Sequence, residues 1–367
     1  MDWAKIAVAL SLIALVVSTG TFVYTSQQMT SLSQQVSQYS GFAGAELYPG
    51  EAALYQKAKQ EGTVVMYSIW DVSDLNAFAQ AFQKRYPGIQ TQFISLQNPE
   101  IITRVGEEFR AQKQTVDVIG SDSAPPNLYP LGAIQDYQTL QKDSLIFNDP
   151  RMTVVSMQVQ VIGYNTKLID QPNLPKSYED LTNPKYAKGG QFPTAMDDPL
   201  RGGPLTWMLI GLRDYWKDDA KWTTFVKGLK ALNTTTFRST GQMARLVIAG
   251  EYAICVPCLT QDILVGKTTG ATVDWAPGLP PVVFPRFAAI YKYAPHPNAA
   301  KLLSEWLAST DSAPIWCSLG RTPARANVPC SVALEQMFPG GTGVISVNPP
   351  SDPSTYINDN IKPLWSP

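Results

Sequence analysis

Short β-rich runs and stretches of helix length alternate along most of this chain, and this alternation is the strongest constraint on its fold. Thr63–Ser68 (TVVMYS) has the length and composition of a buried strand, and Asp74–Tyr86 follows as a helix with Leu75, Phe78 and Phe82 on one face. The other expected strands are Thr91–Leu96, Val116–Gly120, Thr153–Tyr164, Gln191–Met196 and Tyr252–Val256, and the other expected helices are 51–60, Glu100–Gln112, Leu205–Tyr215, Lys221–Leu232, Gly241–Ala249 and Asn298–Ser309. This order predicts an α/β fold with a mainly parallel sheet covered on both faces.

Length and charge narrow the class of protein. A chain of 367 residues suits two lobes better than one core. Thr153–Tyr164 is long enough to run between two lobes, and 271–293 is expected to cross back. The 29 basic and 30 acidic side chains argue against a nucleic-acid partner, because phosphate binding needs a basic face. The only histidine, His296, is too little for a His-cluster metal centre, and we expect no metal site.

The first 45 residues form a separate segment. No charged residue occurs from Ile6 to Ala45, and the apolar part of this stretch, Ile6–Tyr24, is about as long as the ~20 residues that cross a bilayer. Lys5 precedes it, as in a signal segment. We expect an uncleaved transmembrane anchor, with cleavage after Gly20 and secretion as the alternative. Everything after Glu46 is then extracytoplasmic, at the cell surface.

A Gln- and Ser-rich stretch follows the anchor and has a heptad-like spacing of apolar residues. These residues are Met29, Leu32, Val36 and Tyr39. They favour self-association through residues 6–40, and the alternative is a solvated spacer. A subunit of a surface filament, assembled through this helix, is a related alternative function.

Four cysteines fit an oxidising compartment. Of three possible connectivities, the local one pairs Cys255 with Cys258 and Cys317 with Cys330. The CxxC spacing is also compatible with a thiol oxidoreductase that uses Cys255 and Cys258, or with half a zinc site.

No motif of an enzyme is present. The chain has no nucleophile elbow, phosphate loop, dinucleotide fingerprint or HExxH, so we expect no catalytic residue, no cofactor and no enzyme activity. Asp197 and Asp198 follow an expected strand, where α/β proteins place ligand contacts, although a turn-forming role fits them equally. Trp70 lies just past the first strand and is a candidate for stacking on a ligand, whereas Trp207 and Trp216 fit a core helix.

Several segments together resemble the extracellular solute-binding proteins of ABC importers. In order, they are EGTVVMYS (61–68), FQKRYPGIQ (82–90), DVIGSDS (117–123), VIGYNTKL (161–168), LPKSYEDLTNPKYAKGG (174–190), IAGEYAI (248–254), APHPNAAKLLSEWLAS (294–309) and GRTPAR (320–325). The nearest subgroup is that of the ferric-iron, thiamine and phosphonate binders. The resemblance implies a two-lobed type II periplasmic-binding-protein-like fold, a small-molecule solute in the cleft and an importer permease as partner. It also makes His296 a structural residue at a helix start.

The resemblance implies a division of the chain. Residues 1–45 are the anchor and stalk. Lobe 1 holds 46–153 and 266–313, and lobe 2 holds 154–265 and 314–367.

One departure concerns iron. Ferric-binding members carry two adjacent tyrosines after their Gly-Glu element, and the matching positions here are Thr260 and Gln261. Direct ferric binding by the usual ligands is therefore not expected, and Thr260 and Gln261 become candidate contacts for another solute.

The resemblance also suggests a seat for an oxyanion group of the solute. The loop Asp198–Pro204 leads into a helix whose free N–H groups favour negative charge, with Gly202 and Gly203 for close approach and Arg201 as donor. The other candidate solute contacts are Tyr67, Ser68, Trp70, Asp71, Ser121, Asp122, Asp197, Arg238 and Ser239. Because some of these are acidic, a zwitterion or an anion beside a cation stays open.

Overall fold

The computed structural model describes residues 44–338, 343–350 and 352–366. The expected anchor helix, the heptad-like seam and the self-association segment 6–40 lie outside this part of the chain. None of the helices in the described ranges is long and apolar enough to span a bilayer.

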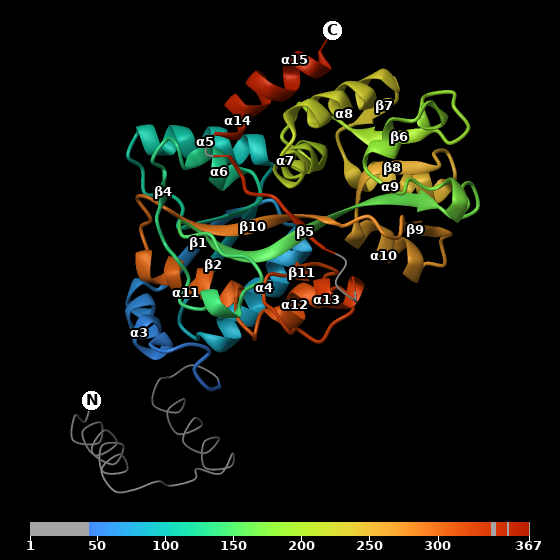
Figure 1. The fold of residues 1–367 in the computed structure, drawn as a ribbon. Coiled ribbons are helices and arrows are strands. Elements are labelled where there is room, and N and C mark those ends of the chain that lie inside the picture. Colours follow the sequence, from blue (N-terminus) through green and yellow to red (C-terminus); the bar gives the residue numbers. More distant parts are fainter. Residues whose placement is uncertain (1–43, 339–342, 351, 367) are drawn as a thin grey trace, which may run out of the picture.

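One sheet of twelve strands runs through the whole molecule (Figure 1). Its main order is β2-β1-β3-β10-β5-β8-β6-β7. The strands are β1 Thr63–Ser68, β2 Gln90–Ser95, β3 Val118–Ser121, β4 Ile134–Gln135, β5 Thr153–Asn165, β6 Thr194–Asp197, β7 Thr235–Phe237, β8 Ile254–Leu259, β9 Val273–Trp275, β10 Val282–Tyr291, β11 Thr322–Pro323 and β12 Ile345–Ser346.

The sheet is parallel at its two ends and antiparallel in its middle. Strand β1 pairs in parallel with β2 and β3, and β6 pairs in parallel with β7 and β8. The long strands β5 and β10 are antiparallel to each other, and each is also antiparallel to its other main neighbour. The expected parallel sheet is therefore confirmed at the two ends, and the two expected crossings meet as one antiparallel pair between them.

Helices cover both faces of this sheet (Figure 1). They are α3 Glu51–Glu61, α4 Val72–Arg85, α5 Asn98–Arg110, α6 Ala124–Leu128, α7 Pro204–Trp216, α8 Asp219–Ala231, α9 Thr240–Ala249, α10 Thr260–Thr268, α11 Pro297–Leu307, α12 Ala313–Ser318, α13 Leu334–Met337, α14 Pro353–Tyr356 and α15 Lys362–Trp365. Short 3₁₀ turns occur at Lys142–Ser144, Gln171–Asn173, Glu179–Thr182 and Pro184–Tyr186, and a π turn at Ile357–Ile361.

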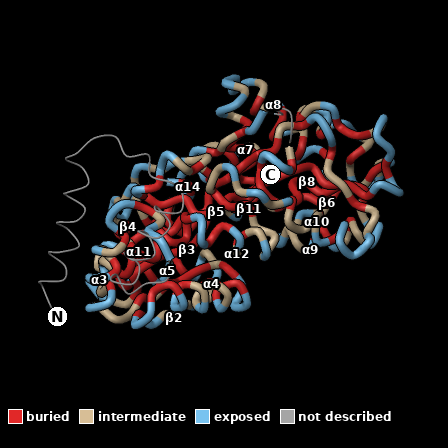
Figure 2. Tube along the Cα trace, turned by 90° about the horizontal axis from the view of Figure 1, so that it is seen from below, coloured by how far each residue is buried: buried red, intermediate tan, exposed pale blue. Residues whose placement is uncertain are grey.

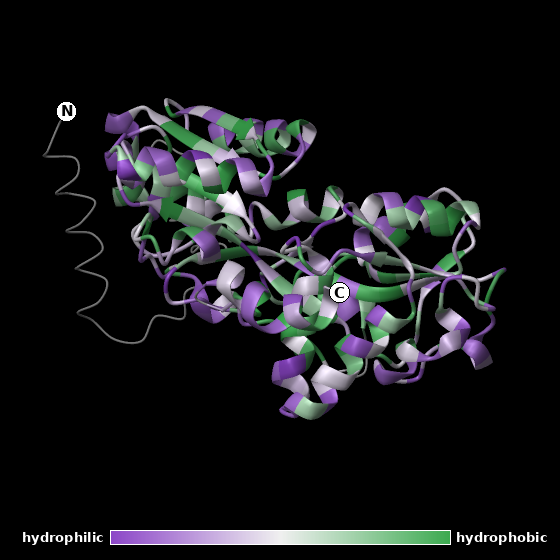
Figure 3. Cartoon of the chain, turned by 90° about the horizontal axis from the view of Figure 1, so that it is seen from above, coloured by the Kyte–Doolittle hydropathy of each residue, from purple (hydrophilic) through white to green (hydrophobic). Residues whose placement is uncertain are grey.

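Two large hydrophobic clusters lie on either side of the crossing strands. The first is built from β1, β3, α4 and α11, and the second from β6, α7, α8 and the C-terminal helices. Buried residues follow the strands in Figure 2, and hydrophobic residues concentrate on the same strands in Figure 3. Trp316 and Ala324 pack in the first cluster, although our division assigned 314–367 to lobe 2.

The C-terminal segment contains helical turns that are not among the elements expected from the sequence. Residues Pro353–Trp365 form successive helical turns. Proline is tolerated at the first positions of both α14 and α15, because the N–H groups there have no partner inside a helix. Ile361 and Trp365 join the second cluster, so packing rather than local propensity forms these turns.

Both local disulfide pairs are present. Cys255 and Cys258, with Cα atoms 5.4 Å apart, are bonded at the two ends of a short stretch of β8, and Cys317 and Cys330 are bonded with Cα atoms 6.2 Å apart. Cys255 and Cys258 are fully buried. Thiol exchange needs an accessible sulfur, which neither of these two residues presents in this structure.

Candidate solute-binding site

A row of polar side chains lies on crossing strand β5, between the two hydrophobic clusters. Ser156, Gln158 and Gln160 alternate along the strand with Met157 and Val159, which pack in a small apolar cluster. All three polar residues are buried. Gln160 Nε2 donates to Gln158 Oε1 at 3.1 Å. Gln160 Oε1 and Ser156 Oγ are buried without a hydrogen-bond partner among the described residues.

Arg286 lies in the middle of the other crossing strand, β10, opposite Ser156 in the ladder. It is 4% exposed, yet its Nε and Nη1 atoms have no hydrogen-bond partner in the described part of the chain. Burial, together with the nearby charge of Arg321, lowers the pKa of Arg286 to about 10, against the attraction of Asp122, Asp262 and Asp74. A buried guanidinium is normally held by carboxylates or carbonyls, so these unused donors mark a place for a ligand.

The loop after β3 contributes Asp122. Asp122 is buried and accepts hydrogen bonds from Asn98 Nδ2 at 2.9 Å and from Ser123 N at 2.6 Å. Its second oxygen, Oδ2, accepts a long bond of 3.4 Å from Gln158. This bond links the end of β3 to the polar row on β5. Ser121 Oγ donates to Asn98 Oδ1, which fixes the same loop.

Asp262 lies in the first turn of α10, after β8. Its Oδ2 atom is buried and has no hydrogen-bond partner among the described residues. Burial raises the pKa of this carboxyl group to about 6, although the charges of Arg286, Arg321 and Arg245 oppose the rise. Asp262 and Arg286 therefore influence each other's charge, and no direct hydrogen bond joins them in the described part of the chain.

Arg321 is the second guanidinium near this site, but it is already partnered. Its Nη2 lies 2.5 Å from Asp74 Oδ2 and 3.5 Å from Asp71 Oδ2. Asp71 itself is exposed at the start of α4. Because Asp74 neutralises Arg321, Arg286 is the guanidinium with free donors.

The expected oxyanion seat at the start of α7 is filled by the protein itself. Asp197, which is fully buried, accepts from the backbone N–H of Leu205 at 3.0 Å and binds Arg201 at 2.7 Å. Burial raises the pKa of Asp197, whereas Arg201 and the Leu205 N–H lower it. The carboxylate of Asp197 therefore occupies the position in which we expected the solute's anionic group.

The glycines of this loop serve that internal pair. Gly202 has a φ of 70°, and a Cβ atom on Gly203 would lie 2.5 Å from Cζ of Arg201. Asp198 accepts from Leu200 N at 3.0 Å, which is the turn-forming role considered for it.

The remaining candidates are dispersed. Trp70 is 1% exposed and lies in the first cluster, in an edge-to-face contact with Trp316 at 4.8 Å, so it packs in the core instead of facing a ligand. Tyr67 also lies in that cluster, and Ser68 Oγ donates to Gly120 O. The exposed residues Arg238 and Ser239 precede α9, where Ser239 caps the helix.

Thr260 and Gln261 lie next to Asp262 in the first turn of α10. Thr260 is buried and Gln261 is partly buried. In the described ranges, no group of three or more His, Cys, Asp or Glu side chains is arranged to hold a metal ion.

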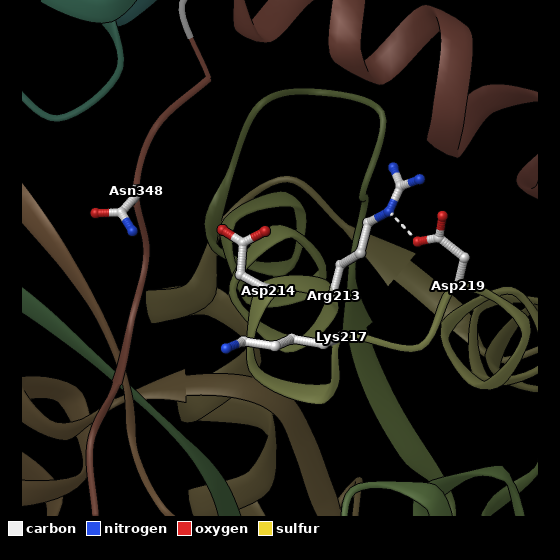
Figure 4. A pocket seen from close by; sticks show the side chains of 5 residues that line it. All are labelled: Arg213, Asp214, Lys217, Asp219 and Asn348. Carbon is white, nitrogen blue, oxygen red and sulfur yellow. Dashed lines mark hydrogen bonds and ion pairs between the residues drawn. The ribbon is translucent and has the colours of Figure 1, made fainter.

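An open groove on the outer side of α7 is a separate feature (Figure 4). It is lined by Arg213, Asp214, Lys217, Asp219 and Asn348. Arg213 donates hydrogen bonds to Asp219 at 2.7 Å and to Tyr356 and Asn360 of the C-terminal turns. The groove is therefore a weaker candidate for a binding site than the crossing strands.

Sequence reasoning missed four residues of the crossing strands. They are Ser156, Gln158, Gln160 and Arg286. The sequence does contain a signal for them. Residues 154–160 (VVSMQVQ) place polar side chains at every second position of a strand expected to be buried. Arg286 is the one charged residue in the apolar run VVFPRFAAIY. Such residues in a buried strand need partners, and a ligand is one possible source.

An α/β sheet with a hydrophobic cluster on either side of its crossing strands, and with buried polar groups on those strands that lack partners among the described residues, is compatible with a protein that binds a small molecule at this junction. The comparisons with known proteins agree. Residues 77–337 match the family model described as bacterial extracellular solute-binding protein, and the chain belongs to this family. The resemblance inferred from the sequence is confirmed. No curated protein matches the chain.

Solved structures share the fold at low sequence identity. Iron-bound HitA from Pseudomonas aeruginosa has a TM-score of 0.61 and 17% identity, covering 80% of this chain and 92% of HitA. The substrate-binding protein of an ABC transporter from Agrobacterium tumefaciens has a TM-score of 0.66 and 16% identity, covering 84% and 97%. AfuA from Actinobacillus pleuropneumoniae, with fructose-6-phosphate bound, has a TM-score of 0.65 and 18% identity, covering 82% and 99%.

Proposed function

We propose that this protein is the receptor of an ABC importer, and that it binds a small polar solute at the crossing strands β5 and β10. It performs no chemistry on the solute and delivers it to a permease. The family supports the class of function, and the solved structure of an importer's substrate-binding protein supports the partner. The interlobe position of Arg286 supports the location of the site.

The observation that carries the proposal is the unpartnered guanidinium of Arg286. Two of its nitrogen atoms are buried without an acceptor, and an unsatisfied buried group of this kind costs free energy that a ligand acceptor would recover. We therefore move the expected oxyanion contact from Arg201 to Arg286, because Arg201 is engaged by Asp197. Ser156 and Gln160 supply the next free polar atoms on the same strand pair.

The site also suggests how binding closes the lobes. Asp122 belongs to the proposed lobe 1 and Asp262 to the proposed lobe 2, and both influence the charge of Arg286 between them. A solute that contacts both carboxylates gains more in the closed arrangement than in an open one, so it shifts the population toward closure. The division into lobe 1 (46–153 and 266–313) and lobe 2 (154–265 and 314–367) remains part of this proposal, with 314–324 better placed in lobe 1.

The test is recovery of the solute. Mass spectrometry of the protein isolated under native conditions should reveal a bound small molecule with an oxyanion group, and calorimetry then gives its affinity. Arg286→Met should weaken binding by about a hundredfold or more, since charge-assisted hydrogen bonds are worth roughly 1.5–3 kcal/mol each. Arg110→Met, at an exposed residue in the last turn of α5, is the matched control and should retain affinity. An equal loss of solute affinity in both variants, or no loss in Arg286→Met, would show that the proposed site is wrong.

The N-terminal segment completes the proposal. We propose that Ile6–Tyr24 anchors the protein in the membrane and leaves the binding lobes outside the cytoplasm, with self-association through 6–40 as a further possibility. Expression of the full chain and of a chain that begins at Ala45 tests this. The full chain should sediment with membranes and resist extraction by high salt, and the shortened chain should not. Sizing of the full chain in detergent then distinguishes a monomer from an assembly.

A further inference from the structure

We infer that the solute carries both signs of charge, with an oxyanion group bound to Arg286 and a cationic N–H group bound to Asp262 and Gln160. This inference rests on the proposed interlobe site and goes on to name the chemical class of its solute.

The unpaired donors of the site need an acceptor, and the described residues supply none. Arg286 has buried N–H groups without a partner, and the nearby Arg321 is tied to Asp74. A carboxylate, phosphonate or similar group is the ligand chemistry that a guanidinium binds best, because both hydrogen bonding and charge favour it.

The unpaired acceptors of the site need a hydrogen-bond donor. Asp262 Oδ2 and Gln160 Oε1 are both buried without a hydrogen-bond partner among the described residues. They come from the first turn of α10 and from the crossing strand β5. Gln160 pairs in the ladder with Leu259, the residue before α10, and the charge of Asp262 acts on Arg286. An ammonium group supplies several N–H donors and a positive charge, and it would satisfy both kinds of acceptor.

The charges around Arg286 exclude the simpler classes. Asp122 and Asp262 act on Arg286, whereas the nearby Arg321 is paired with Asp74 and Arg245 also acts on Asp262, so the site holds both signs of charge. A multiply charged anion such as phosphate would place more negative charge beside the buried carboxyl of Asp262 and would leave its free acceptor unused. A neutral sugar would leave Arg286 and Asp262 buried without counter-charges, and a simple cation would leave the Arg286 donors unused. A solute with one group of each sign satisfies donors and acceptors together.

A panel of matched compounds tests this class of solute. Thermal shift of the full chain is measured with free α- and ω-amino acids, with the monocarboxylates that lack the amino group, with the monoamines that lack the carboxylate, and with inorganic phosphate and glucose. All compounds are used at equal concentration. We expect at least one amino acid to raise the melting temperature, and its two single-charge analogues to raise it much less. The same comparison is made for any solute recovered with the protein.

Asp262→Asn is the variant that separates the charge from the shape of this side chain. It should weaken binding of the doubly charged compound by about tenfold or more. It should also reduce the ratio of affinities between this compound and the monocarboxylate that lacks the amino group. Asp219→Asn, in the outer groove, is the matched control and should change neither.

The outcomes separate this inference from the proposed function. If Arg286→Met abolishes binding, but Asp262→Asn leaves it unchanged or the monocarboxylate binds as tightly as the amino acid, the two-charge inference is wrong and the site stands. If neither substitution affects binding, the proposed site itself is wrong. A panel in which phosphate or glucose stabilises the protein and no amino acid does so also overturns the inference.

Discussion

Replacement of Arg286 by methionine should stabilise the unliganded protein while it abolishes solute binding. Burial in the folded protein lowers the pKa of this guanidinium from its ordinary value to about 10. For a base, a folded-state pKa below the unfolded one means that folding disfavours the charged form. The penalty is present at all pH values below about 10, so it applies in full at neutral pH.

The magnitude follows from the pKa difference. One pKa unit corresponds to about 1.36 kcal/mol, so the fall of this pKa from its ordinary value to about 10 is worth on the order of 3 kcal/mol. This net value already contains the attraction of Asp122, Asp262 and Asp74. Methionine keeps most of the apolar stem, so we expect the free energy of unfolding to rise by about 1–3 kcal/mol, as found when buried charges are replaced by hydrophobic residues.

Arg85 provides a matched comparison, because it is 5% exposed and Arg286 is 4% exposed. Arg85 binds Glu51 at 2.8 Å and Asp311 at 2.9 Å, and it donates to Ala45 O at 2.7 Å. Burial lowers the pKa of Arg85, but the charges of Tyr86 and Glu51 more than reverse this, so its pKa is raised. Arg85→Met should therefore destabilise by about 3–5 kcal/mol, since it leaves the fully buried Glu51 without its counter-charge.

Denaturant unfolding of the two variants and of the wild type, without and with solute, decides the matter. We expect opposite signs in the unliganded protein, and loss of solute-dependent stabilisation in Arg286→Met alone. A clear loss of stability in Arg286→Met, with solute binding intact, would refute the reasoning, because Arg286 would then be a structural residue with partners of its own.

Three further predictions use the same kind of measurement. Asp262→Asn should raise the free energy of unfolding on the order of 2 kcal/mol well above pH 6, because the pKa of the Asp262 carboxyl is about 6 in the folded protein against the usual 3.8. The gain should vanish below pH 3.8, where this carboxyl is protonated in both the folded and the unfolded protein, and a gain independent of pH contradicts the prediction. The charges that face Asp262 are Arg286, Arg321 and Arg245, and they limit the size of the effect. Cys258→Ser opens a very short loop, so it should cost about 2 kcal/mol and leave solute affinity unchanged; disulfide-exchange activity that is present in the wild type and lost in the variant would instead favour an oxidoreductase. Arg201→Ala should cost about 1–3 kcal/mol because Asp197 stays buried without its partner, and calorimetry should show unchanged solute affinity; weakened binding at full stability would restore the anion seat before α7.

The sequence predicted elements well where local pattern and tertiary packing agree. Thr63–Ser68 is found with the expected bounds because a run of β-formers between a helix and a turn has no competing structure. The expected helix Gly241–Ala249 differs from α9 by one residue, since Ser239 caps its start and Gly250 ends it. The turns at 353–365 were missed because their proline and serine content disfavours a helix in isolation, and only contacts of Trp365 and Ile361 with the second cluster compensate.

The candidate site was less predictable, because its parts come from four distant segments. The sequence singled out Asp122 as a loop residue after a strand, and this residue does lie beside the polar row of β5. The sequence also suggested a free arginine before α7, but nothing local indicates that Asp197 binds Arg201 first. Arg286 was missed because the sequence does not show whether an arginine inside a crossing strand has partners. The three-dimensional structure reveals that its Nε and Nη1 atoms lack acceptors among the described residues.

The position of these unpartnered groups on β5 and β10 connects affinity with motion. A receptor that leaves Arg286 and Asp262 without partners is less stable when empty, and the solute regains that free energy only when it reaches both groups at once. Asp122 and Asp262 follow β3 and β8, the strands that flank the crossing pair on its two sides, so the arrangement that satisfies the solute is also the one that brings the two sides together. A solute that reached Arg286 alone would bind without favouring closure. On this argument, Arg286→Met should abolish both binding and closure, whereas Asp262→Asn should weaken closure more than it weakens binding; small-angle scattering with and without solute measures the first quantity and calorimetry the second. Unchanged compaction of Asp262→Asn at saturating solute would show that closure is driven by other contacts.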